Sequence, residues 1–203
     1  MSKAIKTFNE WAYLGKDLGM EKNHSPSVIK MLDLIPNQIL SKNFSFIDIG
    51  CGNGWVVRKI KSKKNCIHSV GIDGAEKMIK KAISLDKNSE YFNLNIEKMN
   101  YKNSFDVVFS MEVFYYFKNP LKVLKYINNY IIKSGGCMLV GVDHYFENTS
   151  SLSWSDALNL KLQTYKIEEW KALFKDSGFK NVKTFQFGKK DSWEGTLVIY
   201  CEK

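Results

Sequence analysis

An acidic and glycine-rich stretch of the sequence combines residue types that commonly bind small ligands. The pattern D-x-G-x-G-x-G starts at Asp48, within the apolar strand expected over 45–49, and places glycines at Gly50, Gly52 and Gly54. Glycine tolerates positive φ angles and lets a ligand approach the main chain closely. The residues after Gly54 have helical spacing, and a helix start offers free N–H groups and a positive dipole end. A tight turn without a ligand is the alternative explanation.

A second acid lies at the end of the next expected strand. Asp73 closes the stretch IHSVGID, about 20 residues after Gly54, which is the spacing at which nucleotide-binding α/β folds place an acid on the ribose hydroxyls. An ionised carboxylate accepts two such hydrogen bonds strongly. Asp73 could also cap a helix starting near Ala75, and both roles are compatible.

Two common nucleotide motifs are excluded by the same residues. A dinucleotide-binding G-x-G-x-x-G loop starting at Gly50 would need glycine at position 55, where the chain has Trp55. A phosphate-binding loop would end in Gly-Lys-Ser or Gly-Lys-Thr, and this ending is absent from the sequence.

The elements that must position these residues alternate in hydrophobic period. Strands are expected over 45–49, 67–72, 91–94, 105–110 and 137–142, and helices over 55–62, 75–85, 121–132 and 167–177. Near-continuous apolar strands alternating with helices predict a parallel sheet covered on both faces. The stretches 180–187 and 196–201, joined by 188–195, predict an antiparallel hairpin. The fold class is therefore α/β, a doubly wound, mostly parallel, seven-stranded sheet with an antiparallel C-terminal hairpin.

Several segments, taken in order, resemble the class I S-adenosylmethionine-dependent methyltransferases of the small-molecule type. The stretch 48–54 resembles the first motif of that family, and Asp73 its ribose-binding acid. The strand 105–110 resembles the fourth strand, and 132–136 resembles the Leu-Lys-Pro-Gly-Gly turn, with Ser134 in place of proline. The resemblance covers about 44–142 and implies the Rossmann-like methyltransferase fold.

The resemblance also implies a site for S-adenosyl-L-methionine, with S-adenosyl-L-homocysteine as the product and no metal. The loop would surround the methionine part, Gly74 and Met78 would line the adenine, and Asn95 replaces an acid that many relatives have there. The implied cofactor-binding residues are Asp48, Gly50, Cys51, Gly52, Gly54, Asp73, Gly74, Met78, Asn95, Ile96, Ser110 and Met111.

The chemistry implied by the resemblance depends mainly on how the acceptor is positioned relative to the methyl group. A methyl group on a sulfonium is already activated, so the attacking atom must be held at about 3–3.5 Å. A general base is needed only if that atom carries a proton that leaves early. His144, just after the strand 137–142, and Tyr116, after the fourth strand, are the candidate catalytic residues, whereas His68 in mid-strand is expected to be structural.

Acceptor specificity is expected from two segments outside the shared core. The stretch 11–24 contains Gly15 and Gly19 and is expected to be a flexible lid, ahead of a helix opened by Ser25-Pro26. The insertion 144–165 is longer than an ordinary connection. The expected substrate-binding residues are Trp11, Tyr13, Tyr115, Tyr116, His144, Tyr145 and Trp154. Aromatic rings favour a planar or cationic acceptor, although core packing is the alternative for each ring, and a packing arm for the lid.

Composition limits the possible partners, the cellular compartment and the number of domains. The chain has 203 residues and a formal net charge of +9, but Arg58 is its only arginine. Four cysteines without a C-x-x-C spacing predict reduced thiols in the cytoplasm, and no apolar run is long enough for a membrane span. We expect a single domain over 1–203, with parts 1–40, 44–142, 143–166 and 167–203.

The function predicted from the sequence is methyl transfer to a small molecule. Nucleic acid is judged an unlikely partner, because sequence-specific readers usually use arginine and no Asn/Asp-Pro-Pro-aromatic motif follows the fourth strand. A nucleic-acid methyltransferase or a non-catalytic S-adenosylmethionine-binding module is the alternative.

Overall fold

The computed structural model describes residues 2–98 and 100–203, which form a seven-stranded sheet in the order β3-β2-β1-β4-β5-β7-β6. The strands are β1 (Phe44–Ile49), β2 (Cys66–Asp73), β3 (Glu90–Asn93), β4 (Phe105–Met111), β5 (Ile132–Val142), β6 (Lys180–Phe187) and β7 (Thr196–Glu202). Strands β1 to β5 pair in parallel, while β7 is antiparallel to β5 and to β6. This arrangement confirms the predicted fold class, including the C-terminal hairpin.

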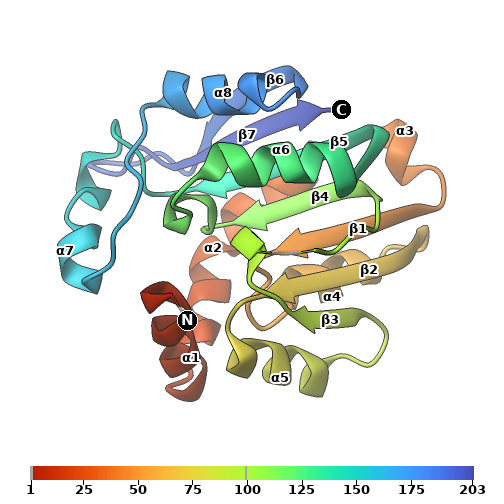
Figure 1. Ribbon diagram of the computed structural model, residues 1–203, viewed down its shortest axis with the longest axis horizontal. Coiled ribbons are helices and arrows are strands. Elements are labelled where there is room, and N and C mark those ends of the chain that lie inside the picture. The colour runs from red at the N-terminus through yellow and green to blue at the C-terminus, as the bar shows by residue number, and fades with distance from the viewer. Residues whose placement is uncertain (1, 99) are drawn as a thin grey trace.

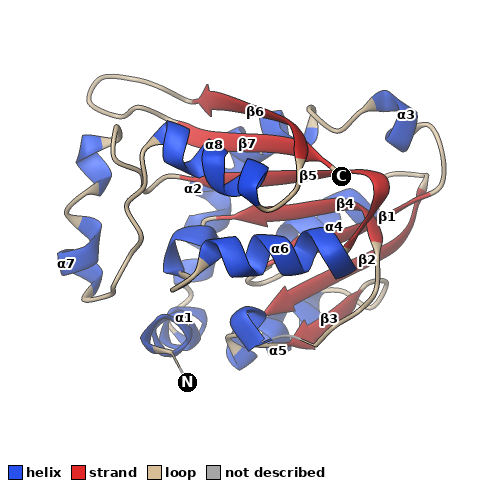
Figure 2. Ribbon diagram, turned by 45° about the horizontal axis from the view of Figure 1, so that its top comes forward, coloured by secondary structure: helices blue, strands red, loops and turns tan. Residues whose placement is uncertain are grey.

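Helices cover both faces of the sheet (Figures 1 and 2). The helices are α1 (Lys3–Tyr13), α2 (Lys16–Leu32), α3 (Asn37–Leu40), α4 (Trp55–Lys61), α5 (Glu76–Leu85), α6 (Pro120–Tyr130), α7 (Trp154–Leu158) and α8 (Ile167–Asp176), with 3-10 turns η1 (Ile96–Lys98), η2 (Phe114–Tyr116) and η3 (Thr149–Ser151). Buried side chains of α6 and α8 pack on one face of the sheet, and those of α2, α4 and α5 on the other.

The sheet has a central strand with no solvent-facing side. All six residues of β1 are buried, because helices lie on both faces and β2 and β4 flank it. A strand buried on both faces reads as a continuous apolar run rather than an alternating one. The carboxyl ends of β1, β2 and β4 point to the same end of the molecule, where α1 and α7 lie (Figure 1).

The N-terminal segment is more helical than expected. Helix α2 runs through Gly19, Ser25 and Pro26, so the predicted helix start at Ser25-Pro26 is wrong; the break between α1 and α2 falls instead at Gly15, with φ of 71°. Proline removes one N–H and disfavours helix interiors. Burial of side chains in the second half of α2, Val28 among them, outweighs this preference.

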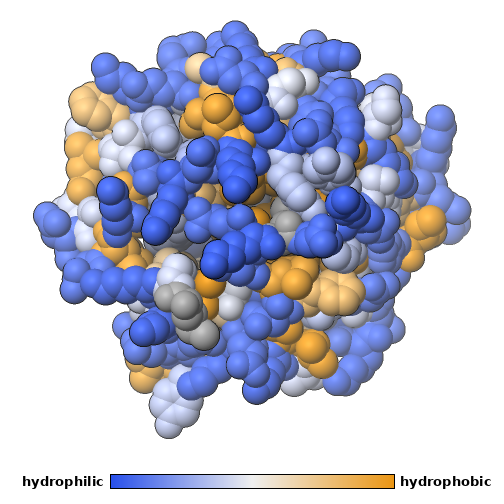
Figure 3. All heavy atoms as spheres, viewed as in Figure 1, coloured by the Kyte–Doolittle hydropathy of each residue, from blue (hydrophilic) through white to orange (hydrophobic). Residues whose placement is uncertain are grey.

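The face seen in Figure 3 is covered mostly by hydrophilic side chains, with hydrophobic ones in separate small groups. Within the described ranges, no helix combines the length and the apolar character needed to cross a membrane.

Candidate S-adenosylmethionine site

The three glycines after β1 have positive φ angles, but their surroundings differ. A Cβ on Gly50 would collide with Val113, and one on Gly54 would lie 2.6 Å from the Tyr91 ring. A Cβ on Gly52 would meet no described heavy atom within 4 Å. Two glycines therefore allow close packing within the protein, and Gly52 faces open space.

The loop is held by the residue that follows Gly52. Asn53 is buried; its side chain accepts a hydrogen bond from the Trp55 N–H (3.1 Å), and its carbonyl accepts one from Arg58 Nη1 (2.6 Å). The single arginine of the chain thus fixes the loop at the start of α4. Asn53 Nδ2 also donates to Asp17 (2.9 Å), which ties the loop to α2.

Asp73, at the end of β2, braces the same loop. Its Oδ2 accepts a hydrogen bond from the Gly52 N–H (2.9 Å), and its Oδ1 accepts one from the Ala75 N–H (2.7 Å) just before α5. Burial raises the pKa of Asp73, while these two hydrogen bonds act in the opposite direction. Each oxygen keeps a further lone pair for a ligand hydroxyl.

Asp48 is the most deeply buried acid of this site. Only 2% of it is exposed, and its Oδ1 has no hydrogen-bond partner in the part of the chain described. Burial, and next the neighbouring Asp73, raises the pKa of Asp48 well above its ordinary value. A buried acceptor without a partner is costly, so this wall of the site is suited to a donor or a cation.

These groups line one cavity of about 510 Å³ at the carboxyl ends of the strands. It brings together many residues singled out in the sequence, from α1 and from the carboxyl ends of β1, β2 and β4 to α7. They are Trp11, Asp48, Gly50, Cys51, Gly52, Asp73, Gly74, Met78, Asn95, Ile96, Met111, Tyr115, Tyr116 and Trp154.

Helices α1 and α2 close one side of the cavity. Phe8 packs edge-on against Tyr116, with ring centroids 5.4 Å apart, and against Trp11 at 5.3 Å. Asp17 is buried at the start of α2 and accepts hydrogen bonds from Asn53 and from Lys81 (2.8 Å). Phe8 and Asp17 were missed in the sequence, although the amphipathic pattern of 3–13 is a signal that could have identified the first.

Two predicted cofactor-binding residues lie outside the cavity lining. Gly54 is covered by the Tyr91 ring, so its lack of a side chain serves internal packing. Ser110 is completely buried within β4, where its hydroxyl donates to the Ile49 carbonyl (2.7 Å). Both residues shape the site indirectly, Gly54 by its packing against Tyr91 and Ser110 by joining β4 to β1.

His144 is not placed where the sequence predicted. It is fully buried; its Nδ1 lies 3.0 Å from the Ser151 carbonyl and its Nε2 2.7 Å from Thr164 Oγ1. A neutral ring that donates to the carbonyl and accepts from the hydroxyl satisfies both contacts. Burial lowers the pKa of His144, so the ring is held as a structural group away from the cavity.

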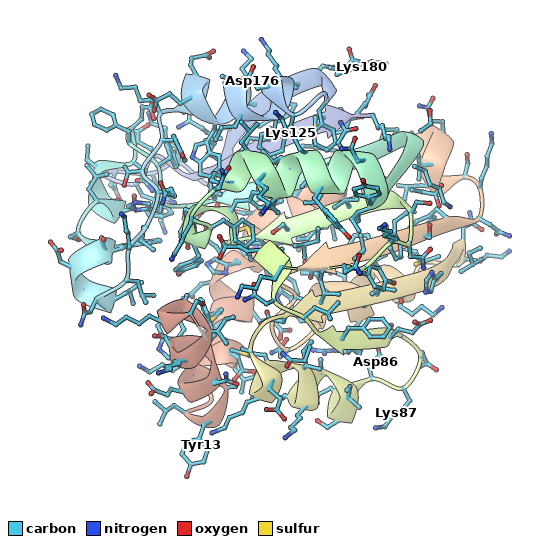
Figure 4. All side chains as sticks on the ribbon, viewed as in Figure 1. Tyr13, Asp86, Lys87, Lys125, Asp176 and Lys180 are labelled. Atoms are coloured by element: carbon cyan, nitrogen blue, oxygen red, sulfur yellow. The ribbon has the colours of Figure 1, made fainter. Side chains whose placement is uncertain are left out.

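Two predicted acceptor contacts are corrected as well. Tyr145 is buried, and its hydroxyl donates to the Gly195 carbonyl (2.9 Å), which anchors the loop of the β6–β7 hairpin. Tyr13 is 79% exposed at the end of α1, below the Lys77 ammonium, and points away from the molecule (Figure 4).

Among the titratable residues that the structure adds to the cavity lining are His24 of α2 and Glu112 after β4. Glu112 has φ of 61°, an uncommon conformation for a residue with a side chain. Burial, and next Asp143, raises the pKa of Glu112 well above its ordinary value. Ligand atoms of His24, Glu112 and Asp143 lie within 4.8 Å of one another. No sequence motif marks this cluster, because its members come from three separate elements.

The fold and the cavity define a class of protein. Residues 19–184 match the family model described as a methyltransferase domain. The chain belongs to this family, the class I S-adenosylmethionine-dependent methyltransferases.

Individual relatives match only part of the chain, at modest sequence identity. The chain is 32% identical over 112 residues to a tRNA U34 carboxymethyltransferase of Aliivibrio fischeri (strain MJ11), an alignment that covers 52% of this chain and 34% of the relative. The chain thus matches about a third of that relative's length.

Two solved structures show the same fold. One is a chain of the complex between the Haloferax volcanii Trm112 methyltransferase activator and a methyltransferase (TM-score 0.84, 24% identity, 96% of both chains). The other is an S-adenosylmethionine-dependent methyltransferase from Mesorhizobium loti (TM-score 0.72, 16% identity, 89% of this chain and 97% of that one).

These comparisons correct the predicted partners. A small-molecule acceptor, with nucleic acid unlikely, was the expectation, but the matched relative is named for tRNA U34 and a structural neighbour is bound to a protein activator. The scarcity of arginine does not by itself exclude a nucleic-acid partner, because lysine also contacts phosphates as a point charge.

The residues present fit S-adenosylmethionine. The cavity volume lies within the range of ~300–1,000 Å³ typical of ligand sites. Asp48, with its partnerless Oδ1, and Gly52, where a Cβ would enter open space, both line this cavity. Asp48, Gly52 and Asp73 would hold the cofactor, which supplies a methyl group activated by its sulfonium.

Proposed function

We propose that this chain binds S-adenosylmethionine in the cavity at the strand ends and transfers its methyl group to an RNA acceptor. The observation that carries the proposal is the continuity of the cavity, which joins the Gly52 and Asp73 wall to a second wall of aromatic rings. A donor and an acceptor can therefore meet without water between them.

The acidic wall is suited to the donor. Asp48 is buried and Asp73 is half-buried, and the two acids lie at the ends of adjacent strands. A ligand that carries a cation relieves the repulsion between them, and ribose hydroxyls can use the free lone pairs of Asp73. Met111 lines the same cavity and would contact the bound cofactor.

The aromatic wall is suited to a planar acceptor. Tyr115, Tyr116 and Trp154 line it, and Trp154 is supported by ring stacking on Trp193 (6.1 Å between centroids). A nucleobase stacked on an aromatic side chain gains ~1–3 kcal/mol, and an enzyme that modifies a base must take it out of the stack. The charge of +9 favours a polyanion outside the cavity.

The protein's contribution to the reaction is mainly geometric. Holding both reactants at near-attack distance replaces a bimolecular encounter by an effectively unimolecular step. Helix α1, through Phe8 and Trp11, keeps water from this side of the cavity.

The test is a labelled-methyl assay. Wild-type protein and the Gly52→Val variant are incubated with S-adenosylmethionine labelled in the methyl group and a cell extract, which is then separated into RNA and small-molecule fractions. We expect nuclease-sensitive label in RNA with the wild type and none with the variant. Label confined to the small-molecule fraction would refute the RNA acceptor. Cofactor binding without label in either fraction would instead indicate a binding module.

A further inference from the structure

His24 is the histidine that the structure places in the cavity wall. Of the three histidines in the chain, His68 lies on β2 and contacts Glu90, and His144 is fixed between Ser151 and Thr164. His24 lies on α2, and its Nε2 is 3.6 Å from Asp143 Oδ2. Its Nδ1 makes no hydrogen bond to the residues described, which leaves this nitrogen available to a ligand.

Asp143 is held so that its carboxylate faces the histidine. It follows directly after β5, is 5% exposed, and its backbone N–H donates to the Glu112 carboxylate. Its Oδ1 has no hydrogen-bond partner among the described residues. A fixed carboxylate beside an imidazole orients the ring and stabilises the imidazolium that forms when the ring takes a proton.

Glu112 supports this pair rather than acting on a ligand itself. Its Oε2 accepts a hydrogen bond from the Tyr115 hydroxyl (2.6 Å), and its Oε1 accepts the Asp143 N–H. Both oxygens are thus engaged by protein donors. The Glu112 side chain thereby links the aromatic wall of the cavity to the position of Asp143.

Burial favours the neutral form of the His24 ring, whereas the carboxylates around it favour protonation. Burial lowers the pKa of His24, while Asp143 acts to raise it. Asp143 faces it from β5 and Glu112 from β4, and Asp48 and Asp73 line the same cavity from β1 and β2. On its own helix, Asp17 is already paired with Lys81.

We propose that His24 is the general base of the transfer and that Asp143 is its positioning residue; this inference depends on the proposed function. The acceptor then attacks through an oxygen or nitrogen that carries a proton. The new bond forms from that atom to the methyl carbon, the carbon–sulfur bond breaks with its electron pair staying on sulfur, and the proton moves to His24 Nδ1.

The same three side chains are also of the types that bind a metal ion, since His24, Glu112 and Asp143 each offer a ligand atom. The hydrogen bonds on both Glu112 oxygens favour the proton role. The two roles differ in one measurable respect, because a chelator would abolish only the metal role.

Activity is one test. We expect His24→Gln to lower kcat for RNA methylation by ~10²-fold or more, to leave the affinity for S-adenosylmethionine within about twofold, and to remove the acid limb of the pH profile. Asp143→Asn should move that limb to lower pH, because the carboxylate that raises the pKa of His24 is lost. His68→Gln, on β2 outside the cavity lining, is the matched control with unchanged activity.

A second measurement needs no acceptor. In protein labelled with ¹⁵N-histidine and saturated with S-adenosylhomocysteine, signals from three imidazole rings are expected. The ring signals of His24 should titrate at lower pH in Asp143→Asn than in the wild type. An unchanged titration in Asp143→Asn, or an undiminished kcat in His24→Gln, would refute the assignment of His24 as the general base. Loss of activity with a chelator and its recovery with Zn²⁺ would also refute this assignment, in favour of a metal role. A wild type that transfers methyl to no acceptor would overturn both the base and the proposed function, even where the titration behaves as expected.

Discussion

At the scale of single residues, Gly52 differs from the other glycines of its loop. Its φ is 54°, and a Cβ there would enter open space of the cavity. Gly135 offers a matched comparison, since its φ is 76° and a Cβ added there would also have no described atom within 4 Å. Gly135 lies at the start of β5, however, away from the cavity.

We therefore expect Gly52→Val and Gly135→Val to lower the free energy of unfolding similarly, by about 1–2 kcal/mol for the left-handed conformation, while only Gly52→Val abolishes cofactor binding. Denaturant unfolding and calorimetric titration with S-adenosylmethionine measure the two effects. Equal cofactor affinities in the two variants would show that Gly52 does not face the ligand.

Asp73 combines two roles in one side chain. Its carboxylate accepts from the Gly52 and Ala75 N–H groups and has lone pairs left for the ribose. Asp73→Ala should weaken S-adenosylmethionine binding by ~2 kcal/mol or more, as for lost charged hydrogen bonds. Calorimetry measures the affinity, with Asp176→Ala on the exposed surface of α8 as the control. Unchanged affinity in Asp73→Ala would contradict the assignment.

Single residues also mark the limit of sequence reasoning at this site. Asp73 and the glycine loop could be placed because spacing along adjacent strands brings them to one edge of the sheet. Gly54 and His144 have the right types and positions in the chain, but their surroundings, the Tyr91 ring and the Ser151 carbonyl, are set by tertiary packing. His24 could not be found for the same reason, since Asp143 approaches it from a different element.

At the scale of elements, α1 and α2 are attached to the core by few polar contacts, of which Asp17 makes two, to Asn53 and Lys81. The two helices are separated at Gly15. Lys16, the first residue of α2, lies in the cavity lining directly after this break. Cofactor bound against Trp11 would hold both helices in place. The hairpin loop 188–195 contributes no residue to the cavity lining, although its Trp193 stacks on Trp154.

Limited trypsin digestion should accordingly cut after Lys16, and this cut should slow several-fold when S-adenosylmethionine is added. Cutting after Lys189 in the hairpin loop serves as the internal control and should keep its rate. Asp17→Asn should speed the first cut in the absence of cofactor, because one charged contact to Lys81 is lost. Equal protection of both sites would indicate a general stabilisation instead of closure over the ligand.

Elements differed in how well the sequence predicted them. The strands and α4 to α6 follow from their apolar periods, because each buries a face in the sheet core. Helix α2 was predicted only in part, since Gly19 and Pro26 both disfavour a helix and only packing of residues such as Met31 against the sheet overrides them. The insertion 143–166 has no single period, and its 3-10 turn and short α7 are fixed by contacts such as Ser155 to the Leu160 carbonyl (2.6 Å).

At the scale of the whole molecule, charge is divided between the outside and the cavity. The chain has a formal net charge of +9, yet the cavity lining contains five acidic side chains, Asp17, Asp48, Asp73, Glu97 and Glu112. Such a division suits a cationic cofactor inside and a polyanionic acceptor outside. The two ligands should therefore respond differently to salt.

Raising NaCl from about 50 to about 300 mM should weaken RNA binding at least tenfold, because each lysine–phosphate contact releases condensed counterions on binding. The affinity for S-adenosylmethionine should change by less than about threefold over the same range, since buried charges are screened much less than exposed ones. Fluorescence anisotropy of a labelled RNA and calorimetry of the cofactor measure the two responses. An RNA affinity as insensitive to salt as that of the cofactor would mean that the basic surface takes no part in acceptor binding, and the net charge would then have to be explained without an RNA partner.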